Sequence, residues 1–153
     1  MTDRELRRTL VGFLFLLQVQ FLLGMAVNLF VTIPAKHPGA QPPEYFGGVV
    51  QSVTWAILQG PLLLILHASL GLLLVAGAIG VAVRAWQRGG RMIRWTTALG
   101  AVCVLAAGFN GGSFLNYNED FSSMIMASLF AVAVACYVLA LYALAQASPV
   151  LPR

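Results

Sequence analysis

Charge is scarce in this chain. Only 9% of its 153 residues are Asp, Glu, Lys or Arg, whereas about a quarter of a typical soluble domain is charged. The hydrophobic fraction is 59% and the mean hydropathy is +0.85. This composition leaves too little polar surface to cover a water-exposed fold, so it excludes an ordinary soluble domain and predicts an integral membrane protein.

Cysteines and acids within apolar runs are also scarce. Cys103 and Cys136 form no CxxC motif, and their places in two apolar runs separate their depths by roughly 8 Å at the helical rise per residue. We therefore expect two free cysteines that pack as small hydrophobes. The lack of paired cysteines separates the chain from proteins of quinone-linked disulfide formation. The lack of an intramembrane acid separates it from small multidrug exporters.

Four apolar runs are long enough to cross a bilayer, which takes roughly 20 residues of helix. We predict an all-α integral membrane four-helix bundle that forms a single transmembrane domain over residues 1–153. The first run is too long for a signal peptide and lacks a small-residue cleavage pattern, so we expect it to be retained. The predicted spans are residues 10–33, 61–83, 93–109 and 121–145.

Between the first two spans lies a segment with two parts. Residues 34–45 hold four of the seven prolines, which predicts an exposed loop because proline interrupts regular helix. Residues 46–59 have apolar residues at helical spacing but are too short to span a membrane. They predict a short amphipathic helix on the outer face of the membrane.

The distribution of Lys and Arg predicts the orientation. Eight of the nine lie on the side of the termini, and only Lys36 lies on the other. Cytoplasmic loops carry the excess of positive charge, so we expect an inner (plasma) membrane protein with both termini cytoplasmic. The sequence pI near 9.6 therefore reflects topology, and we expect the lipid bilayer and no nucleic acid as a partner. The eight are Arg4, Arg7, Arg8, Arg84, Arg88, Arg91, Arg94 and Arg153.

Small or polar residues recur at spacings of three, four and seven in each span. Such stripes let helices approach closely in lipid, so we expect each stripe to face the bundle. In chain order they are Gln20, Gly24 and Asn28; Gly60, His67, Gly71, Ala78 and Ala82; Thr96, Gly100, Cys103, Ala107 and Asn110; and Ser123, Ala127, Ala131 and Ala135.

The stretch 108–126 concentrates polar residues between two apolar runs. Asn110, Gly111 and Gly112 tolerate positive φ, so we predict a sharp turn there. Asp120 can cap the helix that follows. Capping does not explain Asn116 and its neighbours, which we interpret as a ligand or partner surface.

The predicted topology brings residues of all four spans to one depth and indicates an outer pocket. His67 is the only ionisable residue inside a span, and such residues are candidates for function. The alternative is a neutral histidine hydrogen-bonded to Asn28 or to a backbone carbonyl. The candidate ligand-binding residues are Met25, Asn28, His67, Asn110, Asn116, Tyr117, Met124 and Met126.

The segment His67-Ala-Ser-Leu-Gly71 resembles the haem-ligand helix of four-helix b-type cytochromes of the b561 kind, where Gly follows His by four residues. This resemblance covers one helix and implies haem b with His67 as a ligand. Those cytochromes pair histidines on facing helices, and the other spans here contain none. Met124 or Met126 would have to supply the second ligand.

A soft Cu(I) site is a further alternative. Met25, His67, Met124 and Met126 could supply the ligands, with an acidic mouth that attracts cations. The acids of this mouth are Glu44, Glu119 and Asp120.

The segments Gly111-Gly-Ser-Phe-Leu115 and Ser122-Ser-Met-Ile-Met-Ala127 are similar to a loop and helix start in uncharacterised small four-helix bacterial membrane proteins. This resemblance covers the third loop and the fourth span and implies no activity. The sequence holds no specific catalytic motif. We therefore favour a non-enzymatic binding or accessory subunit that presents its outer pocket to a small ligand, a larger membrane complex or a second copy. A b-type haem protein that transfers electrons is the alternative.

Overall fold

The computed structural model describes residues 3–147, so Arg153 of the orientation argument lies outside the described part. Within that part the fold is all-α, and four of its helices are long and apolar enough to cross a membrane. The predicted four-helix membrane bundle with an extra short helix is confirmed. The helices are α1 (Asp3–Phe30), α2 (Tyr45–Leu58), α3 (Leu62–Arg88), α4 (Arg91–Tyr117) and α5 (Asp120–Ala147).

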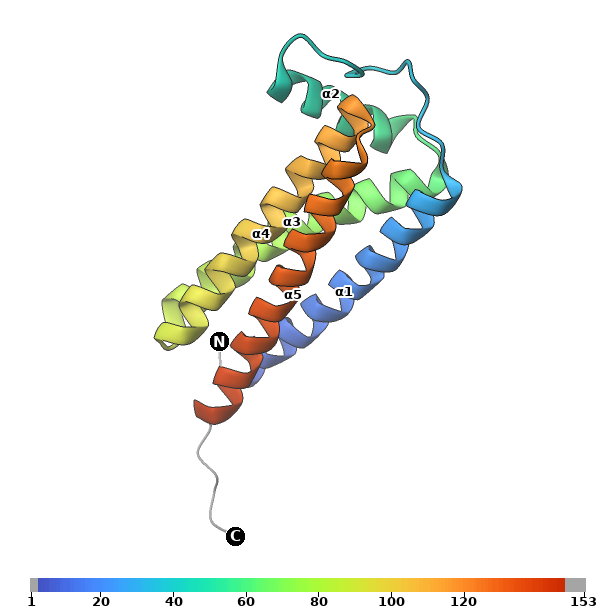
Figure 1. The fold of residues 1–153 in the computed structure, drawn as a ribbon. Coiled ribbons are helices and arrows are strands. Elements are labelled where there is room, and N and C mark those ends of the chain that lie inside the picture. Colours follow the sequence, from blue (N-terminus) through green and yellow to red (C-terminus); the bar gives the residue numbers. More distant parts are fainter. Residues whose placement is uncertain (1–2, 148–153) are drawn as a thin grey trace.

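The four long helices pack in a ring. In the described residues α1 contacts α3 and α5, and α4 contacts the same two helices, but neither diagonal pair is in contact. The short helix α2 lies across one end of the bundle and contacts α3 and α4 (Figure 1). The start of α1, the end of α5 and the turn between α3 and α4 lie at the other end. We call the end with α2 the outer end and the other the inner end.

The inner half of the bundle is solid. Phe13 of α1 meets the ring of Tyr137 of α5 edge-on, with ring centroids 5.0 Å apart. Gly100 of α4 leaves space for that ring, because a Cβ there would lie 3.0 Å from Tyr137 Cζ. The main hydrophobic cluster in this half comprises Leu6, Leu10, Phe13, Leu17, Leu74, Ala78, Val81, Ala85, Ile93, Cys103, Val104, Ala133, Tyr137, Ala140 and Leu144.

The outer end has a separate, smaller cluster. Ala56 of α2 packs there with Leu64 of α3 and Leu115 of α4. Glu44 caps the start of α2 by accepting hydrogen bonds from the backbone N–H groups of Phe46 and Gly47. Residues of both clusters line a cavity that lies where the two clusters meet.

Helix α1 differs from its predicted span at both ends. It begins at Asp3 because the polar lead carries good helix formers and places Leu6 and Leu10 in the core. It ends at Phe30, since a proline at position 34 disfavours helical backbone before it and residues 31–33 are β-branched. The other spans are also longer than predicted.

The turn predicted at residues 110–112 is wrong. Helix α4 continues to Tyr117, and the chain reverses at Asn118, whose φ of 53° and ψ of 42° are left-handed. Gly112 serves close packing instead, because a Cβ there would lie 2.6 Å from Val49 Cγ1 of α2. Asp120 is the first residue of α5.

The longer α4 also changes the relative depth of the cysteines. Cys136 packs beside Gly100, because a Cβ added to Gly100 would lie 3.3 Å from the Cβ of Cys136. Gly100 is three residues from Cys103, so the depths differ by about 4.5 Å, less than the predicted offset. Both cysteines are free and buried.

The small-residue stripes face the bundle on three helices. Gly24 and Gly71 lie at the contact of α1 with α3, and Cys103 and Ala107 are buried on α4. The stripe predicted on α5 is wrong, because Ala127, Ala131 and Ala135 are exposed. Helix α5 is apolar on all sides, and it buries the face that carries Tyr137 instead.

Candidate functional site

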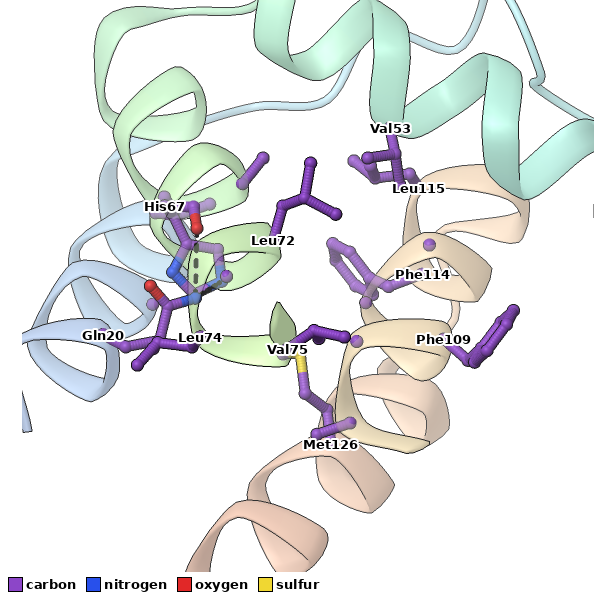
Figure 2. Close-up of a pocket in the computed structure, with 18 of the residues that line it drawn as sticks. Gln20, Val53, His67, Leu72, Leu74, Val75, Phe109, Phe114, Leu115 and Met126 are labelled. Carbon is purple, nitrogen blue, oxygen red and sulfur yellow. Dashed lines mark hydrogen bonds between the residues drawn. The ribbon is translucent and has the colours of Figure 1, made fainter. Parts of the chain in front are cut away.

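A cavity of about 410 Å³ lies between the two hydrophobic clusters, in the outer half of the bundle. All five helices contribute residues to its wall, and α2 forms its roof. Figure 2 shows Val53 of α2 above the cavity and the other helices around it. This volume falls within the range of small-molecule sites, roughly 300 to 1,000 Å³.

Gln20 and His67 form a polar pair in the wall, which also includes the polar side chains of Asn28, Thr54 and Ser123. Gln20 Nε2 donates to the backbone oxygen of His67 at 3.1 Å and lies 3.4 Å from His67 Nε2. A Cβ at Gly24 would lie 2.9 Å from His67 Cε1. The glycine therefore lets the imidazole lie against the backbone of α1. In Figure 2 the two polar side chains occupy one side of the cavity.

Two polar atoms of this pair have no partner in the described structure. Gln20 Oε1 and His67 Nδ1 are buried and accept or donate no hydrogen bond within residues 3–147. A buried polar group without a partner typically costs about 1 to 3 kcal/mol. The pair thus has unused hydrogen-bonding capacity at the edge of the cavity.

The opposite wall is apolar. Phe114 of α4 and Met126 of α5 lie across the cavity from His67 in Figure 2. Phe130 of α5 and Val75 of α3 also line the cavity. The lining includes no Asp, Glu, Lys or Arg among the described residues.

The cavity is open at its edge. Leu72 of α3 lines it and is nevertheless 59% exposed, and Leu105 and Phe109 of α4 are also both lining and exposed. These residues belong to spanning helices. At these three residues the opening is apolar and lies on helices long enough to cross a membrane, whereas exposed Asn28 and Thr54 also line the cavity.

The structure brings together three of the predicted site residues. His67, Asn28 and Met126 line the cavity. Met25 and Met124 do not line it and are 45% and 58% exposed. The four residues of the predicted copper set therefore do not converge.

Asn110 and Tyr117 also lie outside the cavity lining. The Asn110 side chain donates to the backbone oxygen of Ala106, one turn earlier in its own helix. Sequence reasoning missed Gln20 as the partner of His67 and proposed Asn28 or a backbone carbonyl instead. The available signal was the position of Gln20 on the stripe that also carries Gly24 and Asn28.

Asn116, a predicted ligand residue, ties α2 to α4. Its side chain is 2% exposed. The amide nitrogen faces Ser52 Oγ at 2.6 Å and the backbone oxygens of Gly48 and Gly39 at 3.1 Å, while its oxygen accepts from Val49 N at 3.2 Å. An oxygen in the place of that nitrogen would face acceptors only, which fixes the orientation. Asn116 therefore holds the roof of the cavity.

His37 connects the loop before α2 to the same region. Its ring stacks on Trp55 of α2, with centroids 4.3 Å apart and an angle of 18° between the planes. Its Nε2 lies 3.1 Å from the backbone oxygen of Leu115, and its Nδ1 lies 2.9 Å from that of Pro38. The Leu115 oxygen is one of the last four carbonyls of α4, which have no partner within the helix.

Within residues 3–147 no group of three or more His, Cys, Asp or Glu side chains is placed to hold a metal ion. No protein family, curated protein or solved structure matches this chain.

Proposed function

We propose that this chain is a non-enzymatic membrane protein, a binding or accessory subunit whose outer cavity takes a small apolar ligand. The observation that carries this proposal is the cavity between two separate clusters, roofed by a helix that polar contacts hold in place. Helix bundles commonly build ligand sites between facing helices. A dedicated roof held by Asn116 and His37 is consistent with a cavity that is maintained for binding.

The membrane and the orientation are part of the same proposal. We place the chain in the inner membrane of a bacterial cell with both termini cytoplasmic, because Arg residues gather at the inner end of the bundle, whereas the single Lys, Lys36, lies at the outer end. The cavity and α2 would then lie toward the outside. An apolar ligand would enter from the bilayer past Leu72, Leu105 and Phe109.

The test fills the cavity. Gly108 lines it, and a Cβ there would make an ordinary contact of 3.5 Å with Val75 Cγ2. Leucine at position 108 should therefore fold and occupy part of the volume. Gly80 of α3 is the matched control, because a Cβ there would meet nothing within 4 Å and position 80 does not line the cavity.

The measurement is equilibrium binding of radiolabelled dodecyl compounds (dodecane, dodecanol and dodecanoate) to protein in lipid nanodiscs. At least one compound should bind saturably to the native chain and to Gly80→Leu. Gly108→Leu should weaken that binding by about tenfold or more, which corresponds to the loss of roughly 1.4 kcal/mol of binding free energy. Equal binding to both variants, or no saturable binding of any compound, contradicts the proposal.

Electron transfer through haem is the second candidate, because His67 and Met126 border the same cavity and can act as a haem ligand pair. The fit of these residues is poor. His67 Nε2 faces Gln20 Nε2 and the ring lies against Gly24, so the ring would have to leave both contacts to reach an iron. The absorption spectrum of the purified protein tests this. A Soret band that His67→Ala abolishes and His37→Ala retains would favour the haem protein over the apolar-ligand site.

A further inference from the structure

The lining of the cavity restricts the charge of its ligand. No Asp, Glu, Lys or Arg side chain among the described residues borders it, and every spanning helix contributes apolar groups. Burying an ionised head group without a partner in such a place costs several kcal/mol. An uncharged ligand therefore fits the lining better than an anion or a cation.

The contact with Gln20 assigns a tautomer to His67. A carboxamide nitrogen only donates, so the 3.4 Å contact between Gln20 Nε2 and His67 Nε2 is a hydrogen bond only when His67 Nε2 is the accepting nitrogen of a neutral ring. With this assignment the ring proton resides on Nδ1. This N–H group is a donor and Gln20 Oε1 is an acceptor, and neither has a partner within residues 3–147.

One unpaired donor and one unpaired acceptor, on two side chains in contact, call for a group that supplies both functions. A hydroxyl does so, because it donates one hydrogen and accepts through its lone pairs. A ketone or an ether only accepts, and a hydrocarbon does neither. Both protein atoms are covered in this conformation while their side chains border the cavity. A hydroxyl therefore reaches them only after a side-chain rotation within the Gln20–His67 pair, and a haem iron would also require a rearrangement of this pair.

We infer that the ligand is an uncharged amphiphile of the membrane, with an apolar body in the cavity and a hydroxyl group that joins Gln20 and His67. This inference rests on the ligand-binding role proposed above. The hydrocarbon body would pack against Phe114, Phe130 and Met126 on the opposite wall. Asn28, at the rim on α1, continues the polar stripe toward the outer end.

Four probes with the same tail test the head group: dodecanol, dodecyl methyl ether, dodecane and dodecanoate. Dodecanol should bind the native chain in nanodiscs about tenfold more tightly than each of the others, since only it pairs with both buried groups. Equal affinities of dodecanol and the ether would show that the donor is not used. Equal affinities of all four, or tightest binding of dodecanoate, would also overturn the inference but leave a ligand-binding cavity. No saturable binding of any probe would overturn the proposed function itself.

Variants assign the preference to the polar pair. Gln20→Leu should remove the advantage of dodecanol over dodecane while dodecane still binds. Gln18→Leu is the matched control, because Gln18 lies on the same helix, is exposed and does not line the cavity. If Gln20→Leu keeps the full preference, the hydroxyl binds elsewhere and the inference is wrong.

Nitrogen NMR provides a test that does not depend on ligand affinity. In protein with ¹⁵N-labelled histidine, His67 should show a neutral ring with the proton on Nδ1, and dodecanol should shift that resonance. The signal of His37 is identified by its loss in His37→Asn. A proton on Nε2 of neutral His67, or no response of Nδ1 to dodecanol, would overturn the inference.

Discussion

Asn116 of α4 and Ser52 of α2 lie 2.6 Å apart, and both side chains are buried. They are 64 residues apart in sequence, so this contact is a long-range tie between a spanning helix and the short outer helix. The same amide also faces the backbone of Gly48 and accepts from that of Val49. In addition, Gln41 N donates to the backbone oxygen of Asn116 at 2.9 Å. One residue thus fixes the loop and the roof against α4.

Asn116→Ala should destabilise the docking of α2. The substitution removes the hydrogen bonds of the Asn116 amide to Ser52 Oγ and to backbone groups in a buried place, and a buried polar group that loses its partner typically costs about 1 to 3 kcal/mol. Hydrogen exchange in detergent should accelerate across α2 more than across the inner half. Asn110→Ala is the control on the same helix, since Asn110 only bonds its own helix backbone. Equal exchange in the two variants would contradict the assigned tie.

His37→Ala should loosen the loop before α2, because it removes the stacking on Trp55 and the contact with the carbonyl of Leu115. Lys36, the residue before His37, is exposed and provides a cleavage site for trypsin. Cleavage after Lys36 in proteoliposomes should become several-fold faster in the variant. Gln51→Ala, an exposed position of α2, should leave the rate unchanged. An unaltered rate in His37→Ala would show that the ring does not restrain the loop.

The spans could be predicted from the sequence because a bilayer accepts few structures, and long apolar runs must become helices. The end of α4 could not be predicted from the sequence. In water, Asn110-Gly111-Gly112 is typical of a turn, but in lipid a helix tolerates small residues that permit close packing. At Gly112 the backbone of α4 packs closely against the side chain of Val49 of α2. That contact depends on where α2 lies, which no local pattern specifies.

The constraints of the bilayer also allowed part of the candidate site to be predicted from the sequence. His67 was recognised because polar groups at membrane depth turn toward protein. Asn28 was placed by the same argument and lines the cavity, but it is exposed. Met25 and Met124 were wrongly placed in the pocket, since depth alone was considered and the direction around each helix was not. Asn116 was correctly singled out as unexplained by capping, but its contacts are with α2. Whether any of these residues binds a ligand stays a prediction.

Gly100→Leu should destabilise the inner half of the bundle. A Cβ at this position would lie 3.0 Å from Tyr137 Cζ and 3.3 Å from Cys136 Cβ, and the buried tyrosine ring has no space to move. Overpacking of this kind typically costs about 1 to 3 kcal/mol. Thermal unfolding in detergent should occur at a clearly lower temperature than for Gly80→Leu, whose side chain would enter open space. Similar unfolding temperatures would show that α4 and α5 do not pack closely at Gly100.

Labelling of single cysteines should establish the orientation on which the outward-facing cavity depends. Glu119 is exposed in the turn between α4 and α5, and Gln87 is exposed near the end of α3. The excess of Lys and Arg at the inner end predicts that this end is cytoplasmic. A membrane-impermeant maleimide should therefore modify Glu119→Cys in intact cells, with the outer membrane permeabilised where one is present, and should modify Gln87→Cys only after lysis. Native Cys103 and Cys136 add little background because both are 5% exposed. The reverse pattern would place the cavity on the cytoplasmic side and would contradict the proposed entry of its ligand from the outer half of the membrane.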